Sequence, residues 1–299
     1  MTEQTSQTLI GRIVRATGGF YYLDRPGSPL ECRARGLFRK QGINPVVGDM
    51  AEAAFGEDRS GYLLRILPRK NALTRPQVAN VDRLLLVLSA VDPPPNLRVV
   101  DRMLAIAEYK DVDAAIIVTK RDLGVSEAEK LCALYAGVGY VTVDVDAKNG
   151  SVDVVRPLLE GRLCVLAGNT GAGKSTLLNA LDPTLSLLTG ETSRKLGRGR
   201  HTTRTTELFP VAGGFLADTP GFSSLETMML ERIRRDEVAL CFREFSPYRD
   251  NCRFTGCSHQ TELGCAVLEA LHAGKITPSR HESYLDMLQD AKQIKDWEA

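Results

Sequence analysis

The sequence predicts a multi-domain protein in which a small β-barrel precedes a parallel α/β domain and a helical, cysteine-rich segment. From about Thr8 to Pro68, short apolar runs are separated by turn residues, a pattern typical of a small barrel. The middle of the chain alternates strand-like apolar runs with helical stretches, which predicts a mostly parallel sheet. Near the end, four metal-ligand side chains fall within 14 residues. We place the domains at 1–70, 71–225 and 226–299.

The composition excludes several classes of protein. At 299 residues, with 43% apolar and 25% charged side chains, the chain resembles an ordinary globular protein with ample length for a core. No apolar run approaches the roughly 20 residues of a membrane span. The first eight residues, MTEQTSQT, lack the apolar stretch of a secretory signal. We therefore expect a cytoplasmic protein without membrane contact, whose seven cysteines are reduced thiols.

Local charge indicates a phosphate-rich partner more clearly than the net charge of +1 does. Residues 1–70 carry 11 Lys and Arg against 7 Asp and Glu, and residues 194–204 hold five basic side chains and no acid. In the barrel, Phe20 and Tyr22 alternate onto one strand face. With a nearby basic cluster they suit a nucleic-acid surface of aromatic platforms and phosphate contacts. The alternative is that the aromatics form barrel core and the basic residues are ordinary surface. The basic cluster comprises Arg33, Arg35, Arg39 and Lys40.

The α/β segment follows a linker over 69–80. We expect a rigid surface turn at 92–95 (DPPP). The last helix of the chain should bury one face formed by Tyr284, Leu288, Ala291 and Ile294. The predicted buried strands are Leu84–Leu88, Ala114–Val118, Tyr140–Val143 and Leu163–Ala167, and a hairpin is expected over 208–217.

A phosphate-binding loop follows the strand that ends at Ala167. The run GNTGAGKS fits GxxxxGK[ST], and the next residues open a helix. Its glycines let the backbone fold around phosphates, and its amides and the helix N-terminus favour anions. Lys174 should reach the β- and γ-phosphates, and the Ser175 hydroxyl should bind Mg²⁺. The loop comprises Gly168, Asn169, Thr170, Gly171, Ala172, Gly173, Lys174, Ser175 and Thr176.

Asp122 selects the base. Its carboxylate can accept from guanine N1–H and the 2-amino group, donors that adenine lacks, so a site built on it rejects adenine. It ends the segment Thr119-Lys120-Arg121-Asp122, which fits [NT]KxD. Asp146-Ala147-Lys148 stands where a further base-contacting loop often carries SAK.

These motifs occur in an unusual order. Asp218-Thr219-Pro220-Gly221 fits the DxxG that follows the phosphate loop in GTPases, with Asp218 and Gly221 at its fixed positions. The guanine-binding segment normally lies downstream of both, whereas here it lies upstream. The order predicts a circularly permuted GTPase that binds GTP and GDP.

Cys252, Cys257, His259 and Cys265 predict a structural zinc site. Three thiolates and one imidazole are an established tetrahedral set, and four protein ligands close the site. Few aliphatic residues precede Ala266, so one metal ion per chain would supply stability that this short segment lacks. His272 and His281 fall outside the spacing, and we expect them on a helix surface.

With these motifs in order, the chain resembles the family of ribosome small subunit-dependent GTPase A, also named RsgA or YjeQ, over nearly its whole length. The stretches GGFYYL, ECRARGLFRKQGI and PVVGD resemble that family's N-terminal OB-fold domain. The resemblance implies a bacterial cytoplasmic GTPase that acts late in maturation of the 30S subunit. It implies binding to 16S rRNA in the GTP state and release after subunit-stimulated hydrolysis, and we expect a monomer. Thr119 replaces the commoner Asn, and Asp146 replaces Ser.

The catalytic residue requires a separate argument. Ras-like GTPases place a water-orienting Gln directly after DxxG, but Phe222 occupies that position here. The basic loop 197–204 lies between the phosphate loop and DTPG, as switch I does. His201 is therefore the candidate for positioning water, a role that the family's RxHTT-type switch supports. Thr203 is the candidate for Mg²⁺ and the γ-phosphate; alternatively, His201 is an RNA-contacting or exposed residue.

Two other functions remain open from the sequence. The protein could be an RNA-binding assembly factor that uses nucleotide only as a structural ligand. It could also be a permuted GTPase for the large subunit, although the barrel and the zinc motif count against that. The intact set Lys174, Ser175 and Asp218 favours turnover.

Overall fold

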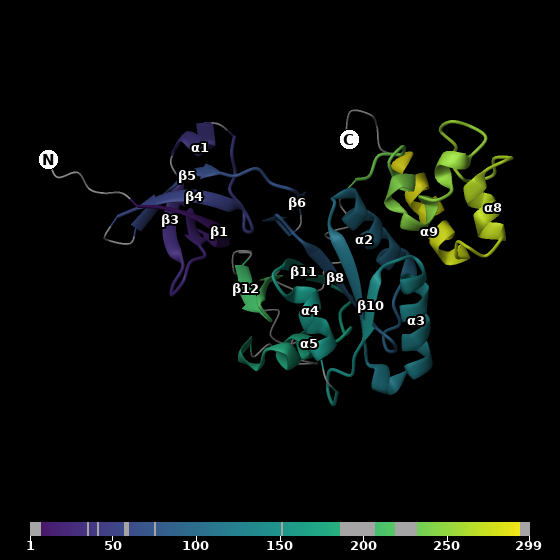
Figure 1. The fold of residues 1–299 in the computed structure, drawn as a ribbon, viewed down its shortest axis with the longest axis horizontal. Helices are drawn as coiled ribbons and strands as arrows, with labels where there is room; N and C mark the ends of the chain where they lie inside the picture. Colours follow the sequence, from purple (N-terminus) through teal and green to yellow (C-terminus); the bar gives the residue numbers. More distant parts are fainter. Residues whose placement is uncertain are drawn as a thin grey trace.

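A single eleven-stranded sheet runs through a computed structural model of the chain and joins the barrel to the α/β domain. Its strand order is β10-β9-β8-β11-β13-β12-β1-β2-β3-β5-β4. The barrel and the C-terminal segment lie at opposite ends of the molecule, with the central domain between them (Figure 1). The structure describes residues 7–34, 36–40, 42–56, 60–74, 76–150, 152–185, 207–218 and 232–293.

The predicted N-terminal barrel is present. β1 pairs with both β2 and β4, and β3 pairs in parallel with β5, which closes the sheet on itself. Alternate residues face inward, and the interior holds Ile13, Leu23, Cys32, Ala53 and Leu63. The barrel elements are β1 (Gln7–Thr17), β2 (Phe20–Leu23), β3 (Leu30–Ala34), α1 (Gly36–Lys40), β4 (Met50–Phe55) and β5 (Ser60–Ile66).

The central domain contains the predicted parallel sheet. β10, β9, β8, β11 and β13 run parallel, and β12 is antiparallel to β13. Because helices cover both faces, these strands are nearly continuous apolar runs. The predicted strands and hairpin match β8 (Arg83–Ser89), β9 (Asp113–Thr119), β10 (Val141–Asp144), β11 (Leu163–Ala167), β12 (Glu207–Val211) and β13 (Gly214–Asp218).

The connecting helices divide between the two faces of this sheet. α2 and α3 pack on the face that buries Leu84, Leu86 and Leu88, and α4 and α5 pack on the face that buries Leu85 and Val87 (Figure 1). Strands β9 and β10 are added on one side of β8, whereas β11 and β13 lie on its other side, so the strand order reverses between β8 and β11. Ligands bind at such a switch point, beyond the carboxyl ends of the strands. The helices are α2 (Leu97–Tyr109), α3 (Val125–Gly137), α4 (Arg156–Leu159) and α5 (Lys174–Leu181).

The expected linker over 69–80 is partly ordered as a hairpin, which corrects the prediction. β6 (Ala72–Leu73) pairs with β7 (Val78–Ala79), and Val78 also forms a bridge with Val47 of the barrel. Each strand has only two residues, too few to show an alternating pattern in the sequence.

The C-terminal segment is helical, as predicted. Its core includes Phe242, Phe245, Tyr284 and Leu288, and it is completed by Ala105 and Ile106 of α2. Tyr284, Leu288 and Ala291 are buried as expected, and Ile294 lies outside the described residues. The elements are short 3₁₀ turns at Val238–Cys241, Arg243–Phe245 and Arg249–Asn251, then α8 (Ala266–His272) and α9 (Pro278–Ala291). Among the described helices, none combines the length and apolarity that crossing a membrane would need.

Candidate nucleotide and metal sites

The predicted nucleotide motifs meet at one edge of the central sheet. The [NT]KxD segment follows β9, the DAK segment follows β10 and the phosphate loop follows β11. Because these strands are parallel members of one sheet, with only β8 between β9 and β11, their carboxyl ends bring the three loops to the same edge. Asp218 ends β13 at the same edge, while His201, Thr203 and Gly221 lie outside the described residues.

Two glycines of the phosphate loop occupy positions that a side chain would disturb. A Cβ on Gly168 would lie 2.3 Å from the carbonyl oxygen of Val87 in β8. Gly173, which leads into α5, has a φ of 85°, in the left-handed region that favours glycine. The loop can therefore lie close to the sheet and turn into a helix whose first residues are Lys174, Ser175 and Thr176.

Lys174 lies folded over its own loop. The side chain is buried, and its ammonium donates to the carbonyl oxygens of Gly168 at 2.5 Å and Asn169 at 2.7 Å. Burial lowers the pKa of Lys174 to about 8. A phosphate group beside this ammonium would favour its charged form, so the loop is electrostatically suited to an anion.

Thr119 connects the base-binding segment to the phosphate loop. Its buried hydroxyl donates to the carbonyl oxygen of Ala172 at 2.6 Å and lies 3.2 Å from that of Leu88. A Cβ on Gly173 would approach this hydroxyl to 3.2 Å. The threonine thus joins two of the three loops directly.

Asp122 is exposed and faces solvent from a short 3₁₀ turn, Arg121–Leu123. Within the described residues its carboxylate forms no hydrogen bond or ion pair, whereas neighbouring Arg121 pairs with Asp144 and Glu129. Both oxygens of Asp122 are therefore available to accept from a base.

Asp146 has a different environment from Asp122. Its carboxylate accepts from the backbone amides of Lys148 and Asn149 at 3.0 and 3.1 Å and from the Asn149 side chain at 3.2 Å. The backbone hydrogen bond from Asn149 is the largest cause of a lowered pKa for Asp146. Asp146 thus shapes its own loop, and the adjacent Ala147 is partly buried.

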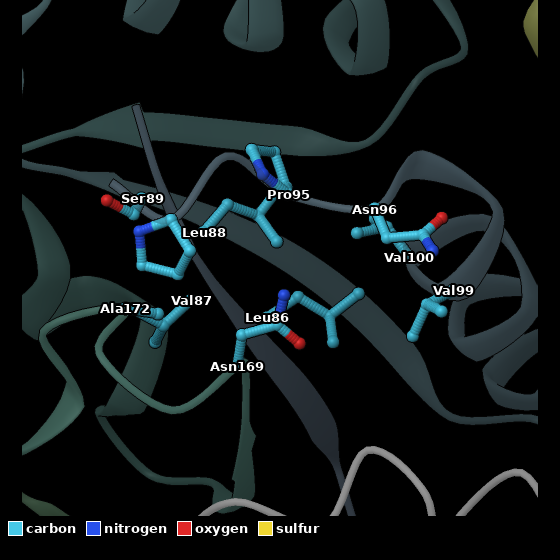
Figure 2. A pocket seen from close by; sticks show the side chains of 11 residues that line it. Leu86, Val87, Leu88, Ser89, Pro95, Asn96, Val99, Val100, Asn169 and Ala172 are labelled. Carbon is cyan, nitrogen blue, oxygen red and sulfur yellow. The ribbon is translucent and has the colours of Figure 1, made fainter. Parts of the chain in front are cut away.

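The loop after β8 also belongs to this site, although the sequence indicated only a surface turn at 92–95. Lys120 donates from its ammonium to the carbonyl oxygen of Asp92. A Cβ on Gly171 would lie 3.3 Å from Cδ of Pro93. Asn96 and Asn169 line opposite parts of a small cavity between this loop and the phosphate loop (Figure 2). The prolines signalled a turn but not its packing partner, which comes from a loop far along the chain.

The four predicted metal ligands converge. Their ligand atoms lie within 4.8 Å of one another. The Sγ atoms of Cys252 and Cys265 are 3.8 Å apart, and Nδ1 of His259 lies 3.6 and 3.3 Å from them. A tetrahedral zinc ion with Zn–S bonds of about 2.3 Å would separate two sulfurs by roughly 3.8 Å. With Cys257 as the fourth donor, the set fits one metal ion.

Surrounding groups hold the metal-ligand loop in shape. His281 contacts the carbonyl oxygen of His259 through Nε2 at 2.8 Å, and Tyr284 donates to that of Ser258 at 2.7 Å. Burial opposes ionisation of Glu262, but hydrogen bonds from the Ser258 hydroxyl and nearby amides lower its pKa to about 2. His281 is buried, so the expectation of a surface position was wrong. Its partner is a backbone oxygen, which spacing cannot reveal.

The barrel presents an aromatic and cationic row on its outer face. Phe20, Arg33 and Tyr62 are aligned across β2, β3 and β5. The Arg33 guanidinium lies 4.8 Å from the centre of the Phe20 ring, and Tyr62 is half exposed. Tyr21 faces the barrel interior instead, so the alternative that placed Phe20 in the core was wrong.

Of the other predicted members of this surface, one packs against the central domain, one is exposed, and two lie wholly or partly outside the described residues. Tyr22 packs against the core of the central domain, with Arg15 stacked 3.8 Å from its ring centre. Lys40 is exposed, and Arg35 and the Arg39 side chain lie outside the described residues.

Comparison with known proteins agrees with this arrangement. The family model described as RsgA GTPase matches residues 66–228, and the RsgA N-terminal domain matches residues 10–63. The chain belongs to the RsgA GTPase family. It is 42% identical over 291 residues to small ribosomal subunit biogenesis GTPase RsgA 2 of Listeria innocua, covering 96% of this chain and 99% of the relative. It is 43% identical to small ribosomal subunit biogenesis GTPase RsgA of Geobacillus thermodenitrificans, covering 95% and 98%.

The RsgA fold is also found among solved structures. The crystal structure of YloQ, described as a circularly permuted GTPase, superposes with a TM-score of 0.80 at 33% identity, covering 99% of this chain and 98% of YloQ. The predicted permutation is therefore confirmed: the [NT]KxD segment precedes the phosphate loop in an RsgA-type GTPase.

Proposed function

We propose that this protein is a GTPase of small ribosomal subunit biogenesis that binds GTP at the three loops described above. The observation that carries the assignment is the Thr119 hydroxyl, which joins the [NT]KxD segment to the phosphate loop at Ala172. It holds the base-binding and phosphate-binding elements of one nucleotide in contact. The relatives named above are small ribosomal subunit biogenesis GTPases, which supports the cellular role.

Different residues bind the base, the phosphates and the magnesium ion. Asp122 accepts from guanine, while Lys120 and the DAK segment border the base. Gly168 through Thr176 surround the phosphates, with Lys174 as the cation. Ser175 and Thr203 would hold Mg²⁺, which supplies charge neutralisation at the β- and γ-phosphates when it is bound.

His201 positions the attacking water in this proposal. The position after DxxG is Phe222, which offers no hydrogen-bonding side chain. A positioned acid–base group contributes about 10²–10⁴-fold to a rate. Asp218 and Gly221, at the γ-phosphate end, complete the turnover machinery.

The two flanking domains bind the 30S subunit and its 16S rRNA. The row of Phe20, Arg33 and Tyr62 has the stacking rings and the cation that suit single-stranded RNA. The Cys₃His cluster takes one zinc ion as a structural centre, because four protein ligands leave no position for substrate. The protein acts in the cytoplasm as a monomer.

The decisive experiment measures GTP hydrolysis by the wild type and His201→Ala, alone and with purified 30S or 50S subunits. We expect stimulation by 30S only, and a stimulated rate about 10²-fold or more lower in His201→Ala at unchanged GTP affinity. Lys130→Ala, which also removes an exposed cation but lies on α3 and has no assigned role, is the matched control and should be stimulated like the wild type.

The other outcomes are equally informative. Stimulation by 50S would indicate a large-subunit factor, and tight 30S binding without stimulated turnover would indicate an assembly factor with a structural nucleotide. Normal stimulation of His201→Ala would show that another group orients the water. In Asp122→Asn, preference should move from GTP toward xanthosine triphosphate, because the amide can donate to the 2-oxo group; unchanged preference would refute the base assignment.

A further inference from the structure

A buried ion cluster joins the C-terminal segment to α2 of the GTPase domain. Arg280 of α9 is fully buried. Its guanidinium donates to Glu244 from Nε at 2.6 Å and Nη2 at 3.1 Å, and to Asp101 of α2 from Nη1 at 2.9 Å. The two carboxylates are 7% and 1% exposed. Buried charges are tolerated only when paired in good geometry, so this guanidinium constrains how α2 and α9 sit together.

Asp101 is the centre of a wider set of contacts. Besides Arg280, it accepts from the Ser283 hydroxyl at 2.6 Å and from the Tyr135 hydroxyl of α3 at 3.0 Å. One turn later, Ala105 and Ile106 enter the C-terminal core. α2 is therefore held between the sheet, α3 and α9, and its position depends on the C-terminal segment.

The N-terminal end of α2 borders the nucleotide site. Asn96 caps the helix by accepting from the amide of Arg98 at 3.1 Å, and it shares a cavity with Asn169 of the phosphate loop (Figure 2). The preceding residues support Lys120 through the Asp92 carbonyl. Asp101 is five residues beyond Asn96, which is about 7.5 Å along a helix axis. The ion cluster is thus close to the loop, although it provides no group to it.

We propose that Arg280 is a positioning residue for nucleotide binding: through Asp101 it fixes α2, and α2 holds the 90–96 loop against Lys120 and the phosphate loop. The inference rests on the proposed nucleotide site. Coupling of this kind is reciprocal. Guanine nucleotide therefore stabilises the α2–α9 interface, and a partner that shifts α9 alters nucleotide affinity.

The test begins with Arg280→Lys, whose single ammonium cannot replace a guanidinium that serves two carboxylates at once. We expect affinity for a fluorescent GDP analogue to fall about tenfold at unchanged zinc content. Glu244→Gln, which keeps the Asp101 contact, should have a smaller effect. The matched control is Asp290→Ala, which removes the exposed Arg102–Asp290 pair between the same two helices and should stay within about twofold of wild type.

A second readout uses the wild type and does not depend on a variant folding. Bound GDP should slow amide hydrogen exchange at 278–288 and 97–109, in the loop at 120–124, and at the four amides that the 90–96 loop contains, those of Ala90, Val91, Asp92 and Asn96. In Arg280→Lys without nucleotide, exchange at the Val91, Asp92 and Asn96 amides should quicken, which local loosening of α9 alone would not cause.

Two results overturn the inference. GDP affinity of Arg280→Lys equal to wild type, or no effect of GDP on exchange at 278–288, would show that α2 carries no coupling while leaving the nucleotide site intact. A wild type that fails to prefer GDP over ADP would instead refute the proposed site, and this inference with it.

Discussion

The two flanking domains are joined to the GTPase core by different kinds of contact. The barrel joint combines backbone pairing with apolar packing. β1 pairs with β12, Val47 pairs with Val78, and the Ala79 amide donates to the Val47 carbonyl at 2.9 Å. Val14 and Val47 also enter the core of the central domain. The C-terminal joint is built from side chains, with a shared apolar core on α2 and a buried ion cluster at Arg280.

This difference determines where each joint is sensitive to substitution. Backbone pairing tolerates most side-chain changes, because every residue except proline offers the same amide donor and carbonyl acceptor. A buried ion pair depends on two individual side chains, and loss of one leaves the other uncompensated. Both joints have apolar packing, so the difference lies in their polar contacts: the C-terminal joint should be sensitive to substitution at Arg280 and its partners, and the barrel joint should tolerate most changes of polar side chains.

The largest expected effect is loss of the metal. Cys257→Ser removes one of four ligands, and structural zinc contributes about 10–16 kcal/mol of folding free energy in small zinc modules. We expect under half an equivalent of zinc by elemental analysis and rapid proteolysis within 232–293. Hydrogen exchange should also rise at 101–109, because α2 shares that core, while the barrel stays protected. A full equivalent of zinc in the variant would contradict the assigned ligand set.

A smaller but still large effect is expected at the ion cluster. Asp101→Ala leaves Arg280 buried with one partner fewer and should lower the free energy of unfolding by about 3–5 kcal/mol, measured by urea denaturation. The matched change in the barrel joint is Glu207→Ala, which removes an exposed pair with Arg15 at 3.7 Å and should cost less than about 1 kcal/mol. Equal losses in the free energy of unfolding for these two variants would contradict the proposed difference between the joints.

In its backbone pairing, the barrel joint should be sensitive at Gly48. Its φ is 89°, and a Cβ there would lie 2.1 Å from the carbonyl oxygen of Ala79. Gly48→Ala should therefore destabilise the protein by about 1–3 kcal/mol and loosen β7, seen as faster exchange at 78–80. Gly36→Ala is the control, since a Cβ there meets no atom within 4 Å. If both variants unfold like wild type, the backbone of this joint has more freedom than the structure indicates.

Much of the fold and of the nucleotide site could be predicted from the sequence, because both depend on local patterns. The strands of the central sheet are unbroken apolar runs, and parallel strands place their following loops at one edge. The barrel, the permuted order and the convergence of Cys252, Cys257, His259 and Cys265 follow from similarly short-range signals. The domain boundaries at 70 and 225 and the roles of individual site residues stay predictions.

The contacts that escaped prediction join distant parts of the chain. Arg280 and Asp101 are separated by 179 positions, and nothing near Arg280 marks it as buried. His281 lies on a helix that begins with polar residues, so its burial depends on the metal-ligand loop packed over it. The pairing of β1 with β12 joins two sheet edges, and no periodicity in either strand shows which edge the other will meet.

The position of β8 also bears on how the chain is made. β8 is central in the finished sheet, between β9 and β11. During synthesis β9 and β10 leave the exit tunnel soon after β8, whereas β11 emerges only after α4. Until then one edge of β8 has no partner strand, and unpaired edges readily form hydrogen bonds with strands of other chains. The nascent protein thus carries the [NT]KxD segment before the phosphate loop, and the emergence of residues 163–176 both covers that edge and adds the last of the three loops of the proposed nucleotide site.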